Sequence, residues 1–149
     1  MNEVRYQQYG QLPVEIHPTN EALGEAAALN LIGKINALLE HQDTVNLIIA
    51  TGNSQYSLYA GLRKHTNAVD WKRVRIFHMD EYVDISDQHP ASFRRYLHEK
   101  IIDIVQPLAF YGVIGDSGDA KGECERYAKL LEQYPADICC LGYGENGHL

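Results

Sequence analysis

Apolar residues recur at two different spacings along the chain, and these spacings predict helices that alternate with short strands. Between Thr19 and Glu40, apolar side chains return at steps of four and three residues, which is the period of one helix face. These positions are Leu23, Ala27, Leu31, Ile35 and Leu38. By contrast, Val45–Ala50 is a short, β-branched apolar run that stops at a glycine, as a buried strand does.

The same two patterns return in the rest of the chain. Further strands are expected at Arg73–Met79, Ala109–Ile114 and Asp137–Leu141. Further helices are expected to begin near Asn53 or Ser54, after Asp87 with Pro90 as the first helical residue, and at Asp119, with the last closed by Pro135. Helices alternating with short apolar strands are typical of βαβ units, which build a mainly parallel sheet with helices on both faces.

The length of the chain limits how many such units it can hold. At 149 residues with 45% apolar residues, the chain has room for one domain with a real core. We therefore expect residues 1–149 to form a single α/β domain. The run Asp137–Leu141 is interpreted as a central parallel strand, which needs at least one following helix to cover it.

Three polar segments each follow a predicted strand. They are Thr51-Gly52-Asn53-Ser54, Asp80-Glu81 and Gly142–His148. Because right-handed crossovers bring the carboxyl ends of parallel strands to one edge, where such sheets bind ligands, we expect the three segments to meet in one crevice.

The first segment joins a strand to a helix. A glycine there lets the backbone approach a ligand, and the free N–H groups of the following helix suit a phosphate. The alternative is an ordinary turn in which Asn53 or Ser54 caps the helix.

The second segment places two adjacent carboxylates at a strand end. Burial and like charge raise a carboxylate pKa toward the range of a general base. The alternative is a turn with one capping acid and one solvated acid. The residues alone leave these two interpretations of Asp80 and Glu81 open.

The third segment has the spacing G-x-G-x-x-G after a strand, but we reject a dinucleotide site. That site needs a helix at the third glycine and an acidic residue about twenty positions later. A glycine loop that presents His148 beside Asn146 instead suggests an acid-base histidine with an orienting partner. The alternative is a flexible tail.

Composition narrows the possible partners. Twenty acidic against thirteen basic residues give a net charge of −7, which argues against nucleic acid and anionic membranes. The N-terminus lacks the pattern of a signal or transit peptide, and no apolar run approaches the length of a membrane span, so we expect a cytoplasmic protein. The three cysteines are interpreted as reduced core thiols, and no spacing of histidines or cysteines indicates a metal site.

Taken together, three stretches closely resemble the glucosamine-6-phosphate deaminase/isomerase family. They are ATGNS after a strand, VDWKRVRIFHMDEYVDISDQHPASFRRYL, and LGYGENGHL at a strand end. The resemblance runs from about Val45 to Leu149. It implies a Rossmann-like, doubly wound α/β fold and an enzyme that converts an amino-sugar phosphate to a ketose phosphate and ammonia without metal or nucleotide cofactor.

The resemblance also implies roles for individual residues. Thr51, Gly52, Asn53 and Ser54 match the phosphate-cradling turn. Asp80 matches the base that moves a proton from C2 to C1 of the opened sugar. His148 matches the residue that assists ring opening, and Asn146 matches the side chain that orients it.

This sequence also departs from the family pattern. Gln55 replaces a proline that many members have, and the acidic and basic residues that follow the GENGHL motif in the family do not occur in this sequence. We therefore interpret the chain as C-terminally truncated and predict that it is inactive alone. Two other functions stay open: a 6-phosphogluconolactonase-type hydrolase, whose members typically carry Asp-Glu-Arg where Asp80-Glu81-Tyr82 stands here, and a catalytically silent sugar-phosphate-binding module. A homo-oligomer is also left open.

Overall fold

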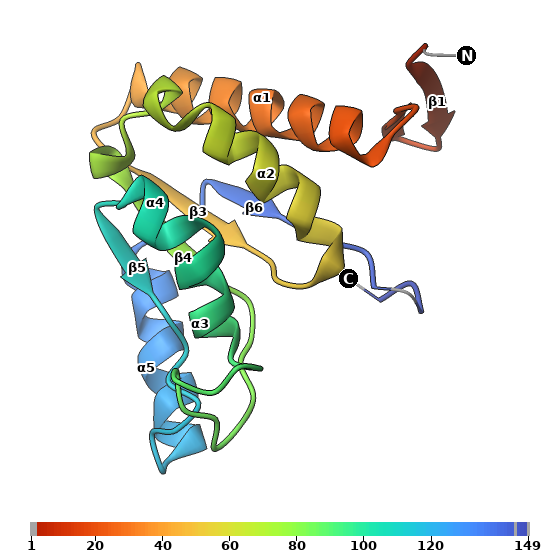
Figure 1. Ribbon diagram of the computed structural model, residues 1–149. Helices are drawn as coiled ribbons and strands as arrows, with labels where there is room; N and C mark the ends of the chain where they lie inside the picture. Colours follow the sequence, from red (N-terminus) through yellow and green to blue (C-terminus); the bar gives the residue numbers. More distant parts are fainter. Residues whose placement is uncertain (1–2, 145, 149) are drawn as a thin grey trace.

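Four parallel strands form the centre of the computed structural model, which describes residues 3–144 and 146–148 (Figure 1). The strand order across the sheet is β5-β4-β3-β6. The bounds are β3 Val45–Ile49, β4 Val74–His78, β5 Ala109–Tyr111 and β6 Ile138–Cys140. Leu47 of β3 pairs with Ile76 of β4 on one side and with Ile138 of β6 on the other. The parallel sheet predicted from the apolar runs is confirmed.

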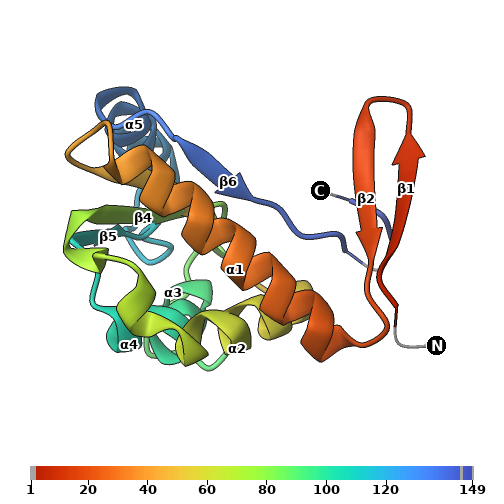
Figure 2. The same ribbon diagram turned by 90° about the horizontal axis from the view of Figure 1, so that it is seen from above.

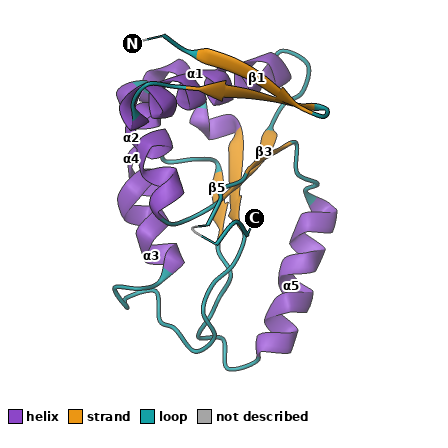
Figure 3. Cartoon of the chain, turned by 90° about the vertical axis from the view of Figure 1, so that its right-hand side faces the viewer, coloured by secondary structure: helices purple, strands orange, loops and turns teal. Residues whose placement is uncertain are grey.

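Helices cover both faces of this sheet, as the sequence pattern predicts (Figures 2 and 3). The bounds are α1 Asn20–Leu39, α2 Tyr56–Lys64, α3 Phe93–Leu97, α4 Asp103–Val105 and α5 Ala120–Gln133, with a π-helical turn at His98–Ile102 joining α3 to α4. Helices α1 to α4 lie on one face and α5 lies on the other. Thr19 and Asp119 cap α1 and α5 with side-chain oxygens that accept from the first-turn amides of Ala22 and Gly122.

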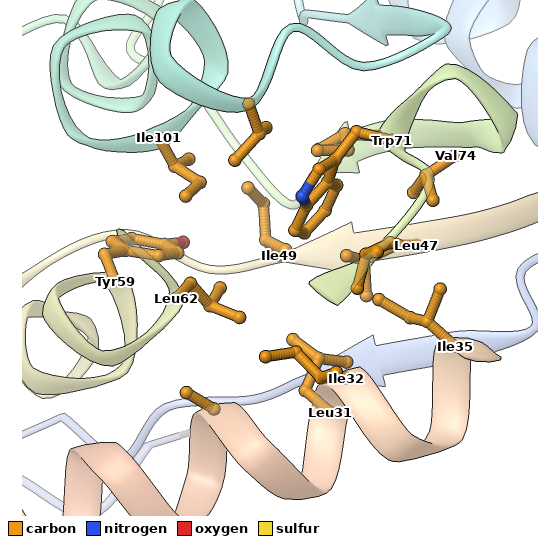
Figure 4. Packing of buried hydrophobic residues seen from close by; sticks show 14 of the residues in the cluster. Leu31, Ile32, Ile35, Leu47, Ile49, Tyr59, Leu62, Trp71, Val74 and Ile101 are labelled. Carbon is orange, nitrogen blue, oxygen red and sulfur yellow. The ribbon is translucent and has the colours of Figure 1, made fainter. Parts of the chain in front are cut away.

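The main core lies between the sheet and the layer formed by α1 to α4 (Figure 4). Alternate residues of β3 point into it, and Val45, Leu47 and Ile49 are all at most 2% exposed. On the opposite face, Phe77 of β4 packs against Tyr111 and Tyr127, so α5 covers β4 and β5.

The part of that opposite face formed by β3 and β6 is less covered. Ile48 is only half-buried and Cys139 is exposed. Within the described part of the chain, β6 pairs with β3 alone, so it is an edge strand and our prediction of a central strand is wrong for the described sheet. The expectation of core thiols is also wrong, because Cys124 and Cys139 are exposed and only Cys140 is half-buried.

The sequence pattern did not predict the hairpin at the N-terminus. Strands β1 (Arg5–Tyr9) and β2 (Leu12–Ile16) pair antiparallel through a two-residue turn in which Gly10 has φ of 60°. The hairpin stands apart from the four-stranded sheet (Figure 3), and most of its residues are exposed. In β2 the apolar Leu12, Val14 and Ile16 alternate with Pro13 and Glu15, but this short run contains a proline and β1 shows no such alternation.

Helix α1 meets the length and composition of a membrane span, contrary to our expectation that no segment does. One side of this helix packs in the fold, since Ala28, Leu31 and Ile35 are buried in the core cluster, whereas Leu23 and Leu29 are exposed.

Candidate functional site

Three loops meet in one cavity of about 470 Å³ at the carboxyl ends of β3, β4 and β6. The lining comes from residues 50–54, from Met79 and Asp80, and from Gly142, Tyr143, Gly144 and His148. The predicted crevice at this edge of the sheet is confirmed. A second cavity of about 410 Å³ lies between α1 and β6, but its lining is mainly apolar. The cavity at the sheet edge brings a carboxylate, an imidazole and a glycine loop together, and it is the candidate site.

The loop after β3 bends sharply before α2 begins. Gly52 has φ of 90°, a conformation that a side chain would strain, and a single 3-10 turn at Asn53–Gln55 leads into the helix. Neither Asn53 nor Ser54 caps this helix, so the alternative interpretation as an ordinary capped turn is wrong. Within residues 3–144 and 146–148, the side chains of Thr51 and Asn53 make no hydrogen bond. They are available to a ligand in the cavity.

The two adjacent carboxylates after β4 have separate surroundings. The side chain of Glu81 is fully buried and accepts hydrogen bonds from the backbone N–H groups of Phe93 and Arg94, both at 3.0 Å. The hydroxyl of Ser92 donates to it at 2.8 Å. Glu81 is therefore the acid that holds the start of α3, and Asp80 is the one that lines the cavity.

This network also corrects the predicted start of the third helix. The helix begins at Phe93 with Ser92 as its N-cap, whereas Pro90 lies in the preceding turn. Glu81, eleven residues earlier in the chain than Ser92, fixes the point at which the helix starts. A contact over that separation leaves no local pattern in the sequence.

The pKa values of the two carboxyl groups move in opposite directions. Partial burial and the neighbouring Glu81 raise the pKa of Asp80, while His148 acts in the other direction. Burial alone would raise the pKa of Glu81, but the hydrogen bonds from Arg94, Phe93, Ser92 and Tyr82 outweigh it and lower the pKa. Asp80 is thus the more basic carboxylate, and it is the one open to the cavity.

Replacing Glu81 by glutamine should lower the free energy of unfolding by about 2–4 kcal/mol, because buried donors then face an amide N–H₂ group. Urea unfolding at neutral pH measures this change. Since the folded-state pKa of Glu81 is lowered, its contribution is present above its ordinary pKa and disappears as pH falls through the folded value.

The matched control is Asp116→Asn. The Asp116 carboxylate pairs with Arg94 at 2.8 Å but is 40% exposed, so its loss should lower the free energy of unfolding much less than the loss of the Glu81 carboxylate. Equal effects of the two substitutions would show that Glu81 does not anchor α3.

The loop after β6 folds back on itself around His148. The Nδ1 atom of His148 contacts Oδ1 of Asn146, and the N–H of Gly144 donates to the His148 carbonyl at 3.0 Å. The imidazole lies so close to Gly144 that a Cβ there would come within 2.1 Å of the ring. Asn146 is thus placed to orient His148. Glu145 and Leu149 lie outside the described residues.

Several residues of this edge were not singled out in the sequence. Met79, Phe93 and Tyr143 also line the cavity. Phe93 falls at a step of four residues from Leu97 and Ile101, and helical periodicity cannot separate the first residue of such an apolar stripe from a residue that faces a cavity. Gln55 is 3% exposed, beneath the loop, where its Nε2 donates to Ser54 Oγ at 3.2 Å.

The lining of the cavity contains no lysine or arginine among the described residues. The two arginines of α3 are engaged elsewhere: Arg94 pairs with Glu81 and Asp116, and Arg95 pairs with Glu99. In the described part of the chain, no group of three or more histidine, cysteine or acidic side chains is placed to hold a metal ion. Apart from the imidazole of His148, the donors that the described residues present to this cavity are neutral amides and hydroxyls.

Comparison with known proteins identifies relatives of this chain. The family model for glucosamine-6-phosphate isomerases/6-phosphogluconolactonase matches residues 18–149. The chain is 35% identical over 112 residues to a glucosamine-6-phosphate deaminase of Exiguobacterium sibiricum, covering 75% of this chain and 44% of the relative. It is 33% identical over 115 residues to a glucosamine-6-phosphate deaminase of Bacillus cereus, covering 77% and 43%. The chain thus spans less than half the length of these relatives.

Solved structures show the same fold. A monomeric glucosamine-6-phosphate deaminase matches with a TM-score of 0.78 at 26% identity, covering 87% of this chain and 54% of that one. A 6-phosphogluconolactonase of Shewanella baltica matches with a TM-score of 0.76 at 22% identity, covering 87% and 56%. The resemblance and the fold class derived from the sequence are both confirmed.

Proposed function

This chain belongs to the family of glucosamine-6-phosphate isomerases and 6-phosphogluconolactonases, and we propose that it supplies the proton-transfer base of an amino-sugar-phosphate deaminase. The substrate would be glucosamine 6-phosphate or a close relative, and the products a ketose 6-phosphate and ammonia. One observation carries this proposal: the glycine loop, Asp80 and His148 line the same cavity.

The reaction needs a group that moves a proton between adjacent carbons. In the proposed step, the Asp80 carboxylate takes the proton from C2 of the open-chain sugar, and a proton passes from the C2 ammonium group to O1, which leaves an enolamine. The carboxylic acid then returns the proton at C1, which leaves an imine at C2. Water hydrolyses that imine to the ketone and releases ammonia. Asp80 suits this role because its raised pKa makes it a better base than an ordinary carboxylate.

Ring opening needs a proton to move between the C1 hydroxyl and the ring oxygen. The contact of His148 Nδ1 with the Asn146 carbonyl oxygen requires the proton on Nδ1, because that oxygen only accepts. The Nε2 atom is then free to take a proton from the sugar and to give one back. These roles of His148 and Asn146 stay predictions.

Thr51, Gly52, Asn53 and Ser54 are proposed to hold the phosphate. Crystals grown with phosphate or sulfate should show the anion against the amides of residues 52–54. Weak binding is expected, because a protein of net charge −7 repels anions and the lining has no lysine or arginine among the described residues. Anions found only at surface arginines would contradict this assignment.

The second candidate is a lactonase, since solved 6-phosphogluconolactonases share the fold. The residues here favour the deaminase, because tyrosine follows Asp80-Glu81 and the curated relatives named above are deaminases. Ammonia release from glucosamine 6-phosphate and hydrolysis of 6-phosphogluconolactone separate the two activities. A silent binding module would show neither. A cytoplasmic setting and the oligomeric state stay predictions.

A further inference from the structure

Two tyrosine hydroxyl groups hold the backbone of the loop after β3. Tyr59 of α2 donates to the carbonyl oxygen of Ala50, and Tyr96 of α3 donates to the carbonyl oxygen of Gly52 at 3.1 Å. The loop is thus fixed at two alternate peptide groups by two different helices. The rings of Tyr59 and Tyr96 also lie together, with centroids 6.3 Å apart.

Fixing a carbonyl also fixes the next amide. In a trans peptide the C=O and the N–H point in opposite directions, and this structure contains no cis peptide among its described residues. The N–H groups of Thr51 and Asn53 therefore point away from the two tyrosines. Neither N–H has a hydrogen-bond acceptor within residues 3–144 and 146–148, and both residues line the cavity.

The surroundings of the tyrosines keep both hydroxyl groups protonated. Tyr59 is 1% exposed, and burial raises its pKa. Partial burial raises the pKa of Tyr96 to about 12. Both side chains are therefore hydrogen-bond donors at neutral pH, and a carbonyl oxygen is the partner that each uses.

The hydroxyl group of Ser54 is also positioned by a side chain, that of the neighbouring Gln55. Because Gln55 Nε2 donates to Ser54 Oγ, the hydroxyl oxygen of Ser54 is already an acceptor. Its own hydrogen remains free to donate. The loop thus offers neutral donors to the cavity, in a lining that has no lysine or arginine among the described residues.

We propose that Tyr59 and Tyr96 are positioning residues that aim the N–H groups of Thr51 and Asn53 at the phosphate of the sugar substrate. This inference rests on the proposed function of the loop. It adds that the loop binds a phosphate through backbone amides whose direction is set from behind by two side chains that do not touch the ligand.

The test is a titration of the ¹⁵N-labelled protein with inorganic phosphate, followed by NMR at the amides of residues 51–54. In the wild type, the amide signals of Thr51 and Asn53 should shift with added phosphate until they reach a plateau. The same concentration of chloride should not shift them. Tyr96→Phe should weaken phosphate binding about three- to ten-fold, the usual range for losing one positioning hydrogen bond. It should also reduce the shift of Asn53 more than that of Thr51.

Two further variants complete the design. Tyr59→Phe should have the complementary effect, with the larger reduction at Thr51. Tyr56→Phe is the matched control, because Tyr56 lies 5.7 Å from the Tyr96 ring but its hydroxyl makes no hydrogen bond in the described part of the chain. It should bind phosphate as the wild type does. If Tyr59→Phe does not fold, the partly exposed Tyr96 decides the question by itself.

The outcomes separate the two proposals. If phosphate shifts the amide signals of Thr51 and Asn53 by the same amounts in Tyr96→Phe as in the wild type, the loop binds phosphate but the positioning role is overturned. If phosphate does not shift these amides in the wild type, the phosphate site itself is wrong and the positioning role falls with it.

Discussion

Replacing Asp80 by asparagine should lower kcat by a factor of roughly a thousand or more, since positioned general bases contribute about 10²–10⁴. The substitution keeps the shape of the side chain but removes the base from the cavity. Activity is to be measured as ammonia release from glucosamine 6-phosphate by the chain extended through the portion that its relatives possess. Phosphate binding should survive, because the loop after β3 is the segment proposed to hold that group.

The pH profile gives a second measure of the same role. The base works only when ionised, so activity should fall as pH drops through the pKa of Asp80, which is raised by partial burial and by Glu81. The control Asp87→Asn removes an exposed carboxylate outside the cavity and should leave the profile unchanged. Turnover of Asp80→Asn near that of the wild type would exclude Asp80 as the base.

The 149-residue chain by itself should release ammonia at least about a hundred-fold more slowly than the extended version, because acid-base catalysis needs closely held groups. His148 is exposed and is held only by contacts within its own loop, among the described residues. The described lining of the cavity also lacks a lysine or arginine to balance a phosphate.

The two versions are to be compared in the same ammonia assay at equal concentration. Folding of the short chain is to be checked by circular dichroism, so that inactivity is not confused with unfolding. Equal rates would mean that His148 is held by something else, such as a second copy of the chain.

The sequence predicted the parts of this fold that depend on local periodicity. The apolar runs of β3 and β4 are buried as the pattern indicates, because one face of each strand must pack against the core. Of the predicted stripe of α1, Leu31 and Ile35 are buried, whereas Leu23 is 44% exposed. The sequence also predicted that three loops meet in one cavity, since parallel strands bring their carboxyl ends to one edge of the sheet. The edge position of β6 left no such pattern, and in the exposed hairpin only the short strand β2 alternates.

The different roles of the residues in the site are set by contacts between residues that are far apart in the sequence. Asp80 and Glu81 are adjacent and chemically alike, and only the approach of Ser92, Phe93 and Arg94 shows which of them is a cap. Tyr96 belongs to a helix that begins about forty residues after the loop it holds. Such long-range hydrogen bonds cannot be predicted from spacing along one sequence.

The most direct test of the central claim is to follow the proton that Asp80 is proposed to carry. The extended protein is to be incubated with glucosamine 6-phosphate deuterated at C2, and the ketose product analysed by NMR. With the wild-type residue, we expect at least part of the deuterium at C1 of the ketose product. With Asp80→Asn, we expect no C1-deuterated product above background. Transfer at the same rate without Asp80, or hydrolysis of 6-phosphogluconolactone in place of ammonia release, would contradict the proposed function.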